Sequence, residues 1–266
     1  MAKEQFGFIG TGNMGGALAT AVARAVSPSK MVLADRDSDK ATALAQQLGC
    51  HTANVIDVAA SSKFVVLGVK PQVLPELAAT ITPSLKENNG VVLISMAAGI
   101  TIAQIRTWFG NFPVIRIMPN PAVAIGSGVV QYAAHPDVTQ DALDAFEAAF
   151  SDVGVLDTLP ETLMDAACAL SGSGPAFAYA FLEALADGGV ACGLPREKAQ
   201  RYAAAMVRGA ANMVLNGAHP AALKDAVCSP GGTTITGMRA LEKGGMRSAV
   251  MEAVIAAYEH AKGTNK

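Results

Sequence analysis

The sequence has almost no excess charge of either sign and no long hydrophobic run. Its 20 basic and 22 acidic residues give a formal net charge of −2, which provides no basic surface for nucleic acid or for an anionic membrane. The longest apolar stretch starts at Val91, but Gly99 and polar residues interrupt it, so it is shorter than the roughly 20 residues that a membrane-spanning helix needs. We therefore expect no nucleic-acid or membrane partner, and a small molecule is the default ligand.

Cysteine is also scarce. The four cysteines are Cys50, Cys168, Cys192 and Cys228. They are too few for a disulfide scaffold and lack the short paired spacing of a zinc site. The first residues, MAKEQ, are charged and lead directly into an apolar run, which does not resemble a secretory signal. These features predict reduced thiols, no bound metal and a cytoplasmic protein.

The chain consists of two halves with different patterns. Up to about residue 155, the apolar runs FGFI, MVLA, FVVLGV, VVLIS and PVIRIM alternate with amphipathic segments. This alternation is typical of βαβ units and predicts a Rossmann-type, doubly wound α/β sheet. After Pro160, five Ala-rich segments without β-branched runs predict a separate all-α domain. We expect a dinucleotide-binding domain over residues 1–160 and a helical, dimerising domain over residues 161–266.

Individual elements follow from the same pattern. Helices are expected over residues 15–26, 40–48, 74–85 and 101–108, with a further helix after a Thr139 cap. Late strands are expected over residues 128–132 and 153–159. The many Ala and Gly residues of the second half would let its helices approach one another closely.

A glycine-rich turn follows the first predicted strand. Gly10, Gly12 and Gly15 have G-x-G-x-x-G spacing and stand directly before a predicted helix. In a dinucleotide site the first glycine makes the tight turn, the second admits the pyrophosphate and the third lets helix and strand pack. The predicted cofactor-binding residues here are Gly10, Thr11, Gly12, Asn13, Met14 and Gly15.

The end of the second predicted strand carries two opposing signals. Asp35 would accept hydrogen bonds from the adenosine ribose and favour NAD, whereas Arg36 would pair with the 2′-phosphate of NADP. We favour NADP(H), because Arg36 begins the loop where that phosphate would lie and Asp35 could turn to pair with it. NAD(H) stays open as the alternative.

Three further loops follow predicted strands at the edge where such sheets bind ligands. Small residues there leave room for the nicotinamide and its ribose. The predicted cofactor residues in these loops are Val69, Lys70, Pro71, Ser95, Ala97, Ala98, Gly99, Met118 and Asn120.

The sequence lacks an evident proton donor for carbonyl reduction. His51, His135, His219 and His260 all stand where a structural or solvated role is expected. The segment SGSGPAFAYA partly resembles the catalytic segment of β-hydroxyacid dehydrogenases, in which a lysine follows the last glycine by four positions. Ala178 occupies that place here. This favours a substrate that needs no enzyme-supplied proton in the hydride step, such as a protonated C=N bond.

The segment CSPGGTTITGM interrupts the helical half. It is expected to end one helix near Cys228 and to start another around Thr233. The free amides of such a start can bind an anion such as a carboxylate, and Ser229, Thr233 and Thr234 add hydroxyl groups. The alternative is an ordinary helix cap in which a hydroxyl satisfies its own backbone.

The chain resembles the pyrroline-5-carboxylate reductases over nearly its full length. The matching stretches are GFIGTGNMG, VKPQ, SMAAGI, IRIMPN, LSGSGPAFAY, LADGGVACGLP and HPAALKDAVCSPGGTTITGMRALE. After Met118–Asn120 the family usually continues Thr-Pro, whereas this chain has Pro121 and Ala122. The resemblance implies reduction of 1-pyrroline-5-carboxylate to L-proline, the last step of proline biosynthesis. It also implies a homodimer, and in some members a decamer.

The resemblance also assigns individual roles. Ser229, Gly231, Gly232 and Thr233 look like the cradle of the substrate carboxylate, and Thr234 looks like the hydroxyl that contacts the ring nitrogen. Thr234 is thus the one candidate catalytic residue, either assisting protonation or only positioning the ring. Asn54 is similar to a cofactor contact. Two other functions stay open: a reductase of another cyclic imine or small carbonyl compound, and a non-catalytic NADP sensor.

Overall fold

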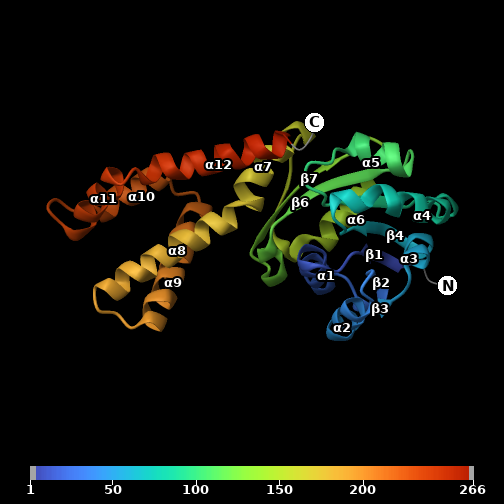
Figure 1. Cartoon of the computed structure of the whole chain (residues 1–266), viewed down its shortest axis with the longest axis horizontal. Coiled ribbons are helices and arrows are strands. Elements are labelled where there is room, and N and C mark those ends of the chain that lie inside the picture. Colours follow the sequence, from blue (N-terminus) through green and yellow to red (C-terminus); the bar gives the residue numbers. More distant parts are fainter. Residues whose placement is uncertain (1–3, 264–266) are drawn as a thin grey trace. The chain divides into compact units, whose positions relative to one another are not determined.

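The computed structural model describes residues 4–263, so the outermost residues of both predicted domains lie outside the described part. The chain forms two compact units (Figure 1). The first contains the residues up to Gly172 together with those from Tyr258, and the second is Ser173–Ala257. This division falls slightly later on the chain than the division predicted at residue 160.

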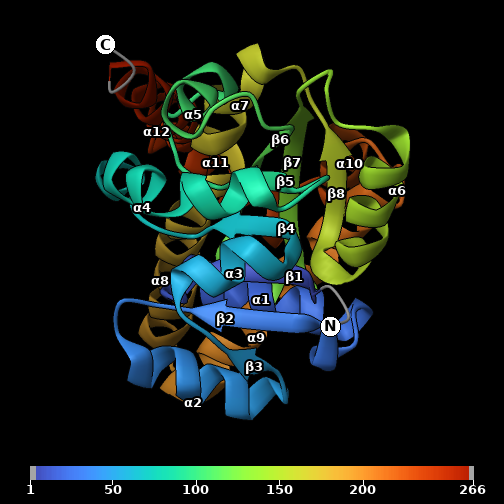
Figure 2. The same ribbon diagram turned by 90° about the vertical axis from the view of Figure 1, so that its right-hand side faces the viewer.

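The first unit is built on one eight-stranded sheet. Its strand order is β3-β2-β1-β4-β5-β6-β7-β8, and Figure 2 shows β3, β2, β1, β4 and β5 following one another. Every neighbouring pair is parallel except β6 with β7, which confirms the predicted doubly wound sheet. The strands are β1 (Glu4–Ile9), β2 (Met31–Ala34), β3 (His51–Thr52), β4 (Ser62–Leu67), β5 (Val92–Ser95), β6 (Val114–Pro119), β7 (Gly128–Ala134) and β8 (Gly154–Thr158).

Helices cover both faces of this sheet. The helices of the first unit are α1 (Asn13–Ala25), α2 (Ser38–Leu48), α3 (Val55–Ser61), α4 (Leu74–Glu87), α5 (Ile102–Phe109), α6 (Gln140–Ala149) and α7 (Met164–Ala167). Phe64 and Val66 of β4 pack in a core with α1 and α6, whereas Val65 and Leu67 pack in a second core with α4 and α5. Alternate residues of a strand point to opposite faces, so a strand buried on both faces is apolar throughout.

Side-chain caps define several helix starts. Asp37, Asn54, Thr101 and Thr139 each accept a hydrogen bond from a backbone N–H in the first turn of the helix that follows. The predicted Thr139 cap is therefore confirmed. Helix α3 was not predicted, because only Val58 and Ala59 of its seven residues are buried and so short a segment shows no clear helical period.

The second unit is helical. It contains α8 (Gly174–Ala191), α9 (Arg196–Leu215), α10 (Pro220–Val227), α11 (Thr233–Lys243) and most of α12 (Met246–Gly263). The first of the five Ala-rich segments after Pro160, over residues 161–170, is not one continuous helix. It is broken into a 3-10 turn, α7 and a π turn over Cys168–Gly172, all within the first unit.

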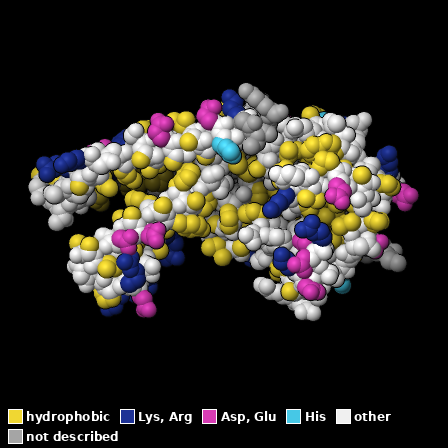
Figure 3. Space-filling model, viewed as in Figure 1, with side chains coloured by type: hydrophobic (Ala, Val, Ile, Leu, Met, Phe, Trp, Pro, Cys, Tyr) yellow, Lys and Arg dark blue, Asp and Glu magenta, His cyan; other side chains and the backbone are white. Residues whose placement is uncertain are grey.

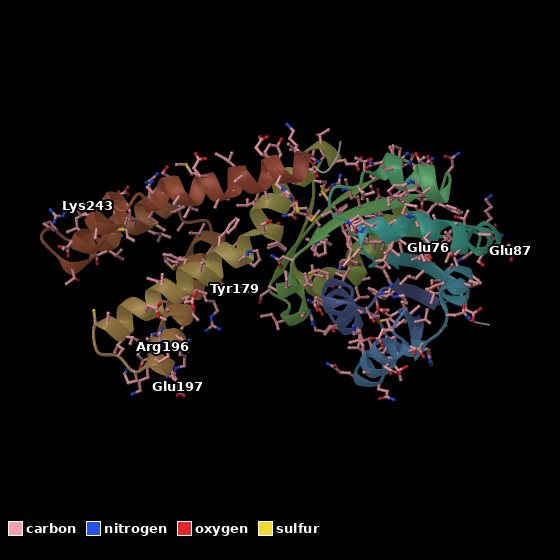
Figure 4. The ribbon with its side chains drawn as sticks, in the orientation of Figure 1. Glu76, Glu87, Tyr179, Arg196, Glu197 and Lys243 are labelled. Atoms are coloured by element: carbon pink, nitrogen blue, oxygen red, sulfur yellow. The ribbon has the colours of Figure 1, made fainter. Side chains whose placement is uncertain are left out.

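Helices α8 and α9 pack through small residues. Ala186, Ala199 and Ala203 are their buried side chains, and a Cβ placed on Gly189 would lie 3.2 Å from that of Ala199. Arg196, at the start of α9, pairs with Asp187 of α8, and Figure 4 labels Arg196, Glu197 and Tyr179 on these helices. The expected close approach of Ala- and Gly-rich helices is thus confirmed for this pair.

Many apolar side chains of the second unit are exposed. Figure 3 shows hydrophobic side chains on the surface of these helices. Those with large exposed fractions include Tyr179, Met206, Leu215, Val227, Met251 and Ile255. No helix within residues 4–263 is both long and apolar enough to cross a membrane.

Candidate active site

The glycine-rich turn between β1 and α1 has the geometry of a dinucleotide cradle. Gly10 has a φ of +98°, a conformation that favours glycine. A Cβ on Gly15 would lie 2.0 Å from the carbonyl oxygen of Gly10, so only glycine lets α1 approach the strand end. Gly68, directly after β4, is also tightly packed, since a Cβ on it would lie 2.5 Å from the same oxygen.

Gly12 has a different role from its neighbours. A Cβ there would meet no atom within 4 Å, and its φ of −64° is open to any residue. Gly12 is exposed, as is Asn13, and no side chain in the described part of the chain caps the start of α1. The free N–H groups there, with the positive end of the helix dipole, fit a pyrophosphate.

Asp35 lies at the end of β2, beside this turn. Its carboxylate accepts hydrogen bonds from the Thr11 N–H at 2.6 Å and from the Thr11 hydroxyl at 3.1 Å. The Asp37 N–H donates to its other oxygen at 2.9 Å. Burial raises the pKa of Asp35, but the hydrogen bonds from Asp37 and Thr11 outweigh it and hold the pKa below its usual value. Asp35 is therefore held by Thr11 and Asp37 and is not turned towards Arg36, the arrangement that would favour NADP(H).

A hollow of about 340 Å³ opens beside Asp35. Asn54 lines it, but the Asn54 side chain caps α3: its Oδ1 accepts from the Asp57 N–H at 2.9 Å, and its Nδ2 donates to the Asp57 carboxylate at 2.7 Å. The remaining lining residues are Ser38, Ala41, Thr42, Thr52 and Ala53. Two larger hollows, of about 770 and 950 Å³, contain none of the predicted site residues.

The second predicted site is the start of α11. Gly232 is the N-cap residue, and no described side chain caps this helix, so the ordinary hydroxyl cap is not formed. The Gly232 N–H donates to the Ser229 carbonyl at 3.1 Å, which leaves the amides of Thr233 and Thr234 for a ligand. A Cβ on Gly232 would lie 2.5 Å from the Ser229 hydroxyl oxygen. Ser229, Thr233 and Thr234 are exposed, so the geometry suits an anion with hydroxyl partners.

Comparison with known proteins gives the family. A family model described as pyrroline-5-carboxylate reductase dimerisation matches residues 161–264, and one described as NADP oxidoreductase coenzyme F420-dependent matches residues 5–99. The pyrroline-5-carboxylate reductase of Escherichia coli is 36% identical over 99% of both chains. The chain belongs to the pyrroline-5-carboxylate reductase family.

Other members of the family are similar to this chain over almost its whole length. The pyrroline-5-carboxylate reductase of Pisum sativum is 38% identical, covering 96% of this chain and 94% of its own. The solved structure of Plasmodium falciparum pyrroline carboxylate reductase, with NADP bound, has a TM-score of 0.87 and 29% identity over 100% of both chains. Similarity to this reductase family therefore spans both compact units.

The remaining predicted cofactor residues of this chain lie in the loops that follow β4, β5 and β6. These strands are parallel neighbours, so their carboxyl ends share one edge of the sheet with β1 and β2. Lys70 and Ala98 are exposed there, whereas Ser95, Ala97, Gly99 and Met118 are buried. Val69 and Pro71 are half-buried.

Asn120 is buried, and both polar atoms of its side chain form hydrogen bonds within the first unit. Its Nδ2 donates to the Ser171 carbonyl at 3.1 Å, and its Oδ1 accepts from the Val129 N–H at 3.3 Å. Gln131 also bonds the Ser171 hydroxyl, at 3.0 Å. The Asn120 side chain thus ties the end of β6 to the segment around Ser171, a link that the sequence pattern does not reveal.

Gly12→Ala tests the cradle. A Cβ at this position meets no protein atom but enters the space in front of the α1 amides, so we expect an unchanged melting temperature. We expect NADPH binding to weaken by about 1 kcal/mol, or roughly fivefold, from crowding of the ligand. Isothermal titration calorimetry gives the Kd and circular dichroism the melting temperature. An unchanged Kd would place the pyrophosphate elsewhere.

Proposed function

We propose that the chain reduces the C=N bond of 1-pyrroline-5-carboxylate to give L-proline, with NADPH as the preferred reductant and NADH as the alternative. The observation that carries this proposal is the uncapped start of α11, with Ser229, Thr233 and Thr234 around free amides, in a chain that also has a complete dinucleotide cradle. Relatives that bear this activity in their names match over almost the whole chain.

The first unit binds the nucleotide. The α1 amides hold the pyrophosphate, and the loops after β4, β5 and β6 receive the nicotinamide end. NADPH supplies the hydride. A family model for an NADP oxidoreductase covers residues 5–99, and the related Plasmodium falciparum structure holds NADP, which supports NADP(H).

The start of α11 binds the substrate. The amides of Thr233 and Thr234 and the Ser229 hydroxyl hold the carboxylate, and the Thr234 hydroxyl contacts the ring nitrogen. The positive end of the helix dipole favours the carboxylate over a neutral group. Gly231, with a φ of +68°, shapes the turn that presents these groups.

No side-chain acid is assigned to the hydride step. Ala178 stands on α8 where a dehydrogenase of hydroxy acids would have lysine. His135 Nδ1 accepts from the Asp137 N–H at 3.1 Å and lies 3.1 Å from Arg106 Nη1. His219 Nδ1 accepts from the Ala221 N–H at 3.2 Å, so both rings are already engaged by other groups of the protein. An imine that is already protonated needs only orientation and a fixed electrostatic environment.

The assembly and location belong to the same proposal. The exposed apolar side chains of α8–α12 and the match to a dimerisation model support a homodimer through the helical unit. We propose decamers as a further assembly of such dimers. The four described cysteines are all free, which supports a cytoplasmic location.

A substrate panel tests the activity. We expect NADPH oxidation with 1-pyrroline-5-carboxylate to exceed, in kcat/KM, that with cyclic imines lacking the carboxylate and that with small oxo acids. Higher kcat/KM with an uncharged imine would indicate a different imine reductase. Binding of NADPH without turnover of any compound would indicate a nucleotide sensor.

A further inference from the structure

The carboxylate of Asp35 is fixed more firmly than a side chain at a strand end needs to be. Oδ2 accepts two hydrogen bonds, both from Thr11, and Oδ1 accepts a third from the Asp37 N–H. Thr11 is itself buried, with 8% of its surface exposed. Its backbone precedes Gly12, so one residue links the pyrophosphate cradle to the acidic group at the end of β2.

The surroundings of Asp35 contain charges of both signs. Arg36 is exposed, while Lys40 lies 3.4 Å from the Asp37 carboxylate and adds a weak attraction at Asp35. Among residues 4–263, Asp35 is the only acidic residue that lines the 340 Å³ hollow. A ribose hydroxyl in this hollow would find an ionised acceptor, whereas a 2′-phosphate would meet a like charge beside Asp35 and attraction only from Arg36.

Resting on the proposed function, we propose that Thr11 is a positioning residue for nucleotide selectivity. By holding Asp35 as an acceptor for the adenosine ribose, Thr11 lets the enzyme bind NADH as well as NADPH. Without the Thr11 hydroxyl, Asp35 keeps one bond to Oδ2 instead of two and can turn towards Arg36. The ribose acceptor is then lost, and the repulsion of the 2′-phosphate decreases.

The test measures binding and does not depend on turnover. Isothermal titration calorimetry gives the Kd of NADP+ and of NAD+ for the full-length wild type and three variants. Asp35→Ser removes the carboxylate. Thr11→Val removes only the hydroxyl at nearly constant volume, and Thr11→Ser, the matched control, keeps it. Circular dichroism confirms that each variant is folded.

We expect the wild type to bind both nucleotides with Kd values within about tenfold of each other. The hydrogen bond from the ribose of NAD+ to Asp35 and the ion pair of the NADP+ 2′-phosphate with Arg36 should contribute similar free energies. Asp35→Ser should shift the selectivity at least about tenfold towards NADP+. Thr11→Val should shift it about threefold or more in the same direction, mainly through weaker NAD+ binding. Thr11→Ser should stay near the wild type.

Two results would overturn the proposal. An unchanged selectivity in Asp35→Ser would show that the carboxylate does not contact the ribose. A shift in Asp35→Ser without one in Thr11→Val would show that Asp35 acts without help from the hydroxyl. Failure of the proposed reaction would appear separately, as absent turnover of 1-pyrroline-5-carboxylate by a wild type that still binds both nucleotides.

Discussion

Arg116→Met is expected to lower the free energy of unfolding by about 3 to 5 kcal/mol, the usual effect of removing one partner from a buried ion pair. Arg116 lies in the middle of β6 with 2% of its side chain exposed. Its guanidinium contacts Glu161 at 3.3 Å and Asp165 at 3.0 Å. Glu161 also accepts from the Ile102 N–H at 2.6 Å, so the arginine joins β6, the start of α5 and α7. Methionine fills similar space but leaves both carboxylates without their shared cation.

Urea unfolding of the two proteins measures this effect. The single tryptophan, Trp108, lies in α5 and packs against the core of the same unit, so its fluorescence reports on that region. The matched control is the triple variant Arg116→Met, Glu161→Gln and Asp165→Asn, which should recover part of the loss because no charge is left behind. A loss below about 1 kcal/mol in Arg116→Met, the range of an exposed pair, would contradict this interpretation.

Thr234→Val is expected to lower kcat/KM for 1-pyrroline-5-carboxylate by about 1 to 3 kcal/mol in barrier terms, the range for a lost hydrogen bond to a charged group. The side chain is exposed at the first turn of α11, so the substitution leaves packing intact. Thr234→Ser keeps the hydroxyl and should retain most of the activity. Steady-state kinetics with saturating NADPH make the comparison.

The same kinetics distinguish the two roles considered for Thr234. A hydroxyl that only holds the ring raises KM when removed, whereas one that assists protonation lowers kcat. Gly237→Ala is the control on the same helix, because a Cβ there meets nothing within 4 Å, and its kinetics should match the wild type. Equal kcat/KM for Thr234→Val and the wild type would remove Thr234 from the mechanism.

Much of the fold could be predicted because its signals are local. Apolar runs of strand length, alternating with amphipathic segments, predicted the strands of the parallel sheet, and Thr139 stands as the cap expected for α6. The glycine spacing predicted a close approach of helix and strand at Gly15. A Cβ on Gly15 would lie only 2.0 Å from the Gly10 carbonyl oxygen, which confirms this prediction. Helix α3 could not be predicted, because its seven residues bury little apolar surface.

The details of the site were less predictable because they depend on contacts distant in sequence. Asp35 and Arg36 indicated different nucleotides, and only the bonds from Thr11, 24 residues away, show how the carboxylate is held. Arg116 in PVIRIM is a single charge in an apolar strand, which indicates a buried ion pair. Its partners Glu161 and Asp165, however, lie 45 and 49 residues further along the chain. The hydrogen bond from the Gly232 N–H to the Ser229 carbonyl likewise depends on the conformation of the turn, which the sequence pattern does not specify.

The central claim is hydride transfer to the imine carbon of 1-pyrroline-5-carboxylate. NADPH deuterated at C4 of the nicotinamide, on the transferred side, should give L-proline with one deuterium on the ring carbon that formed the C=N bond, and one NADPH should be oxidised for each proline formed. Mass spectrometry locates the label and absorbance follows the nucleotide. Nucleotide oxidation without labelled proline, or no oxidation with enzyme that binds NADPH, would contradict the proposed function.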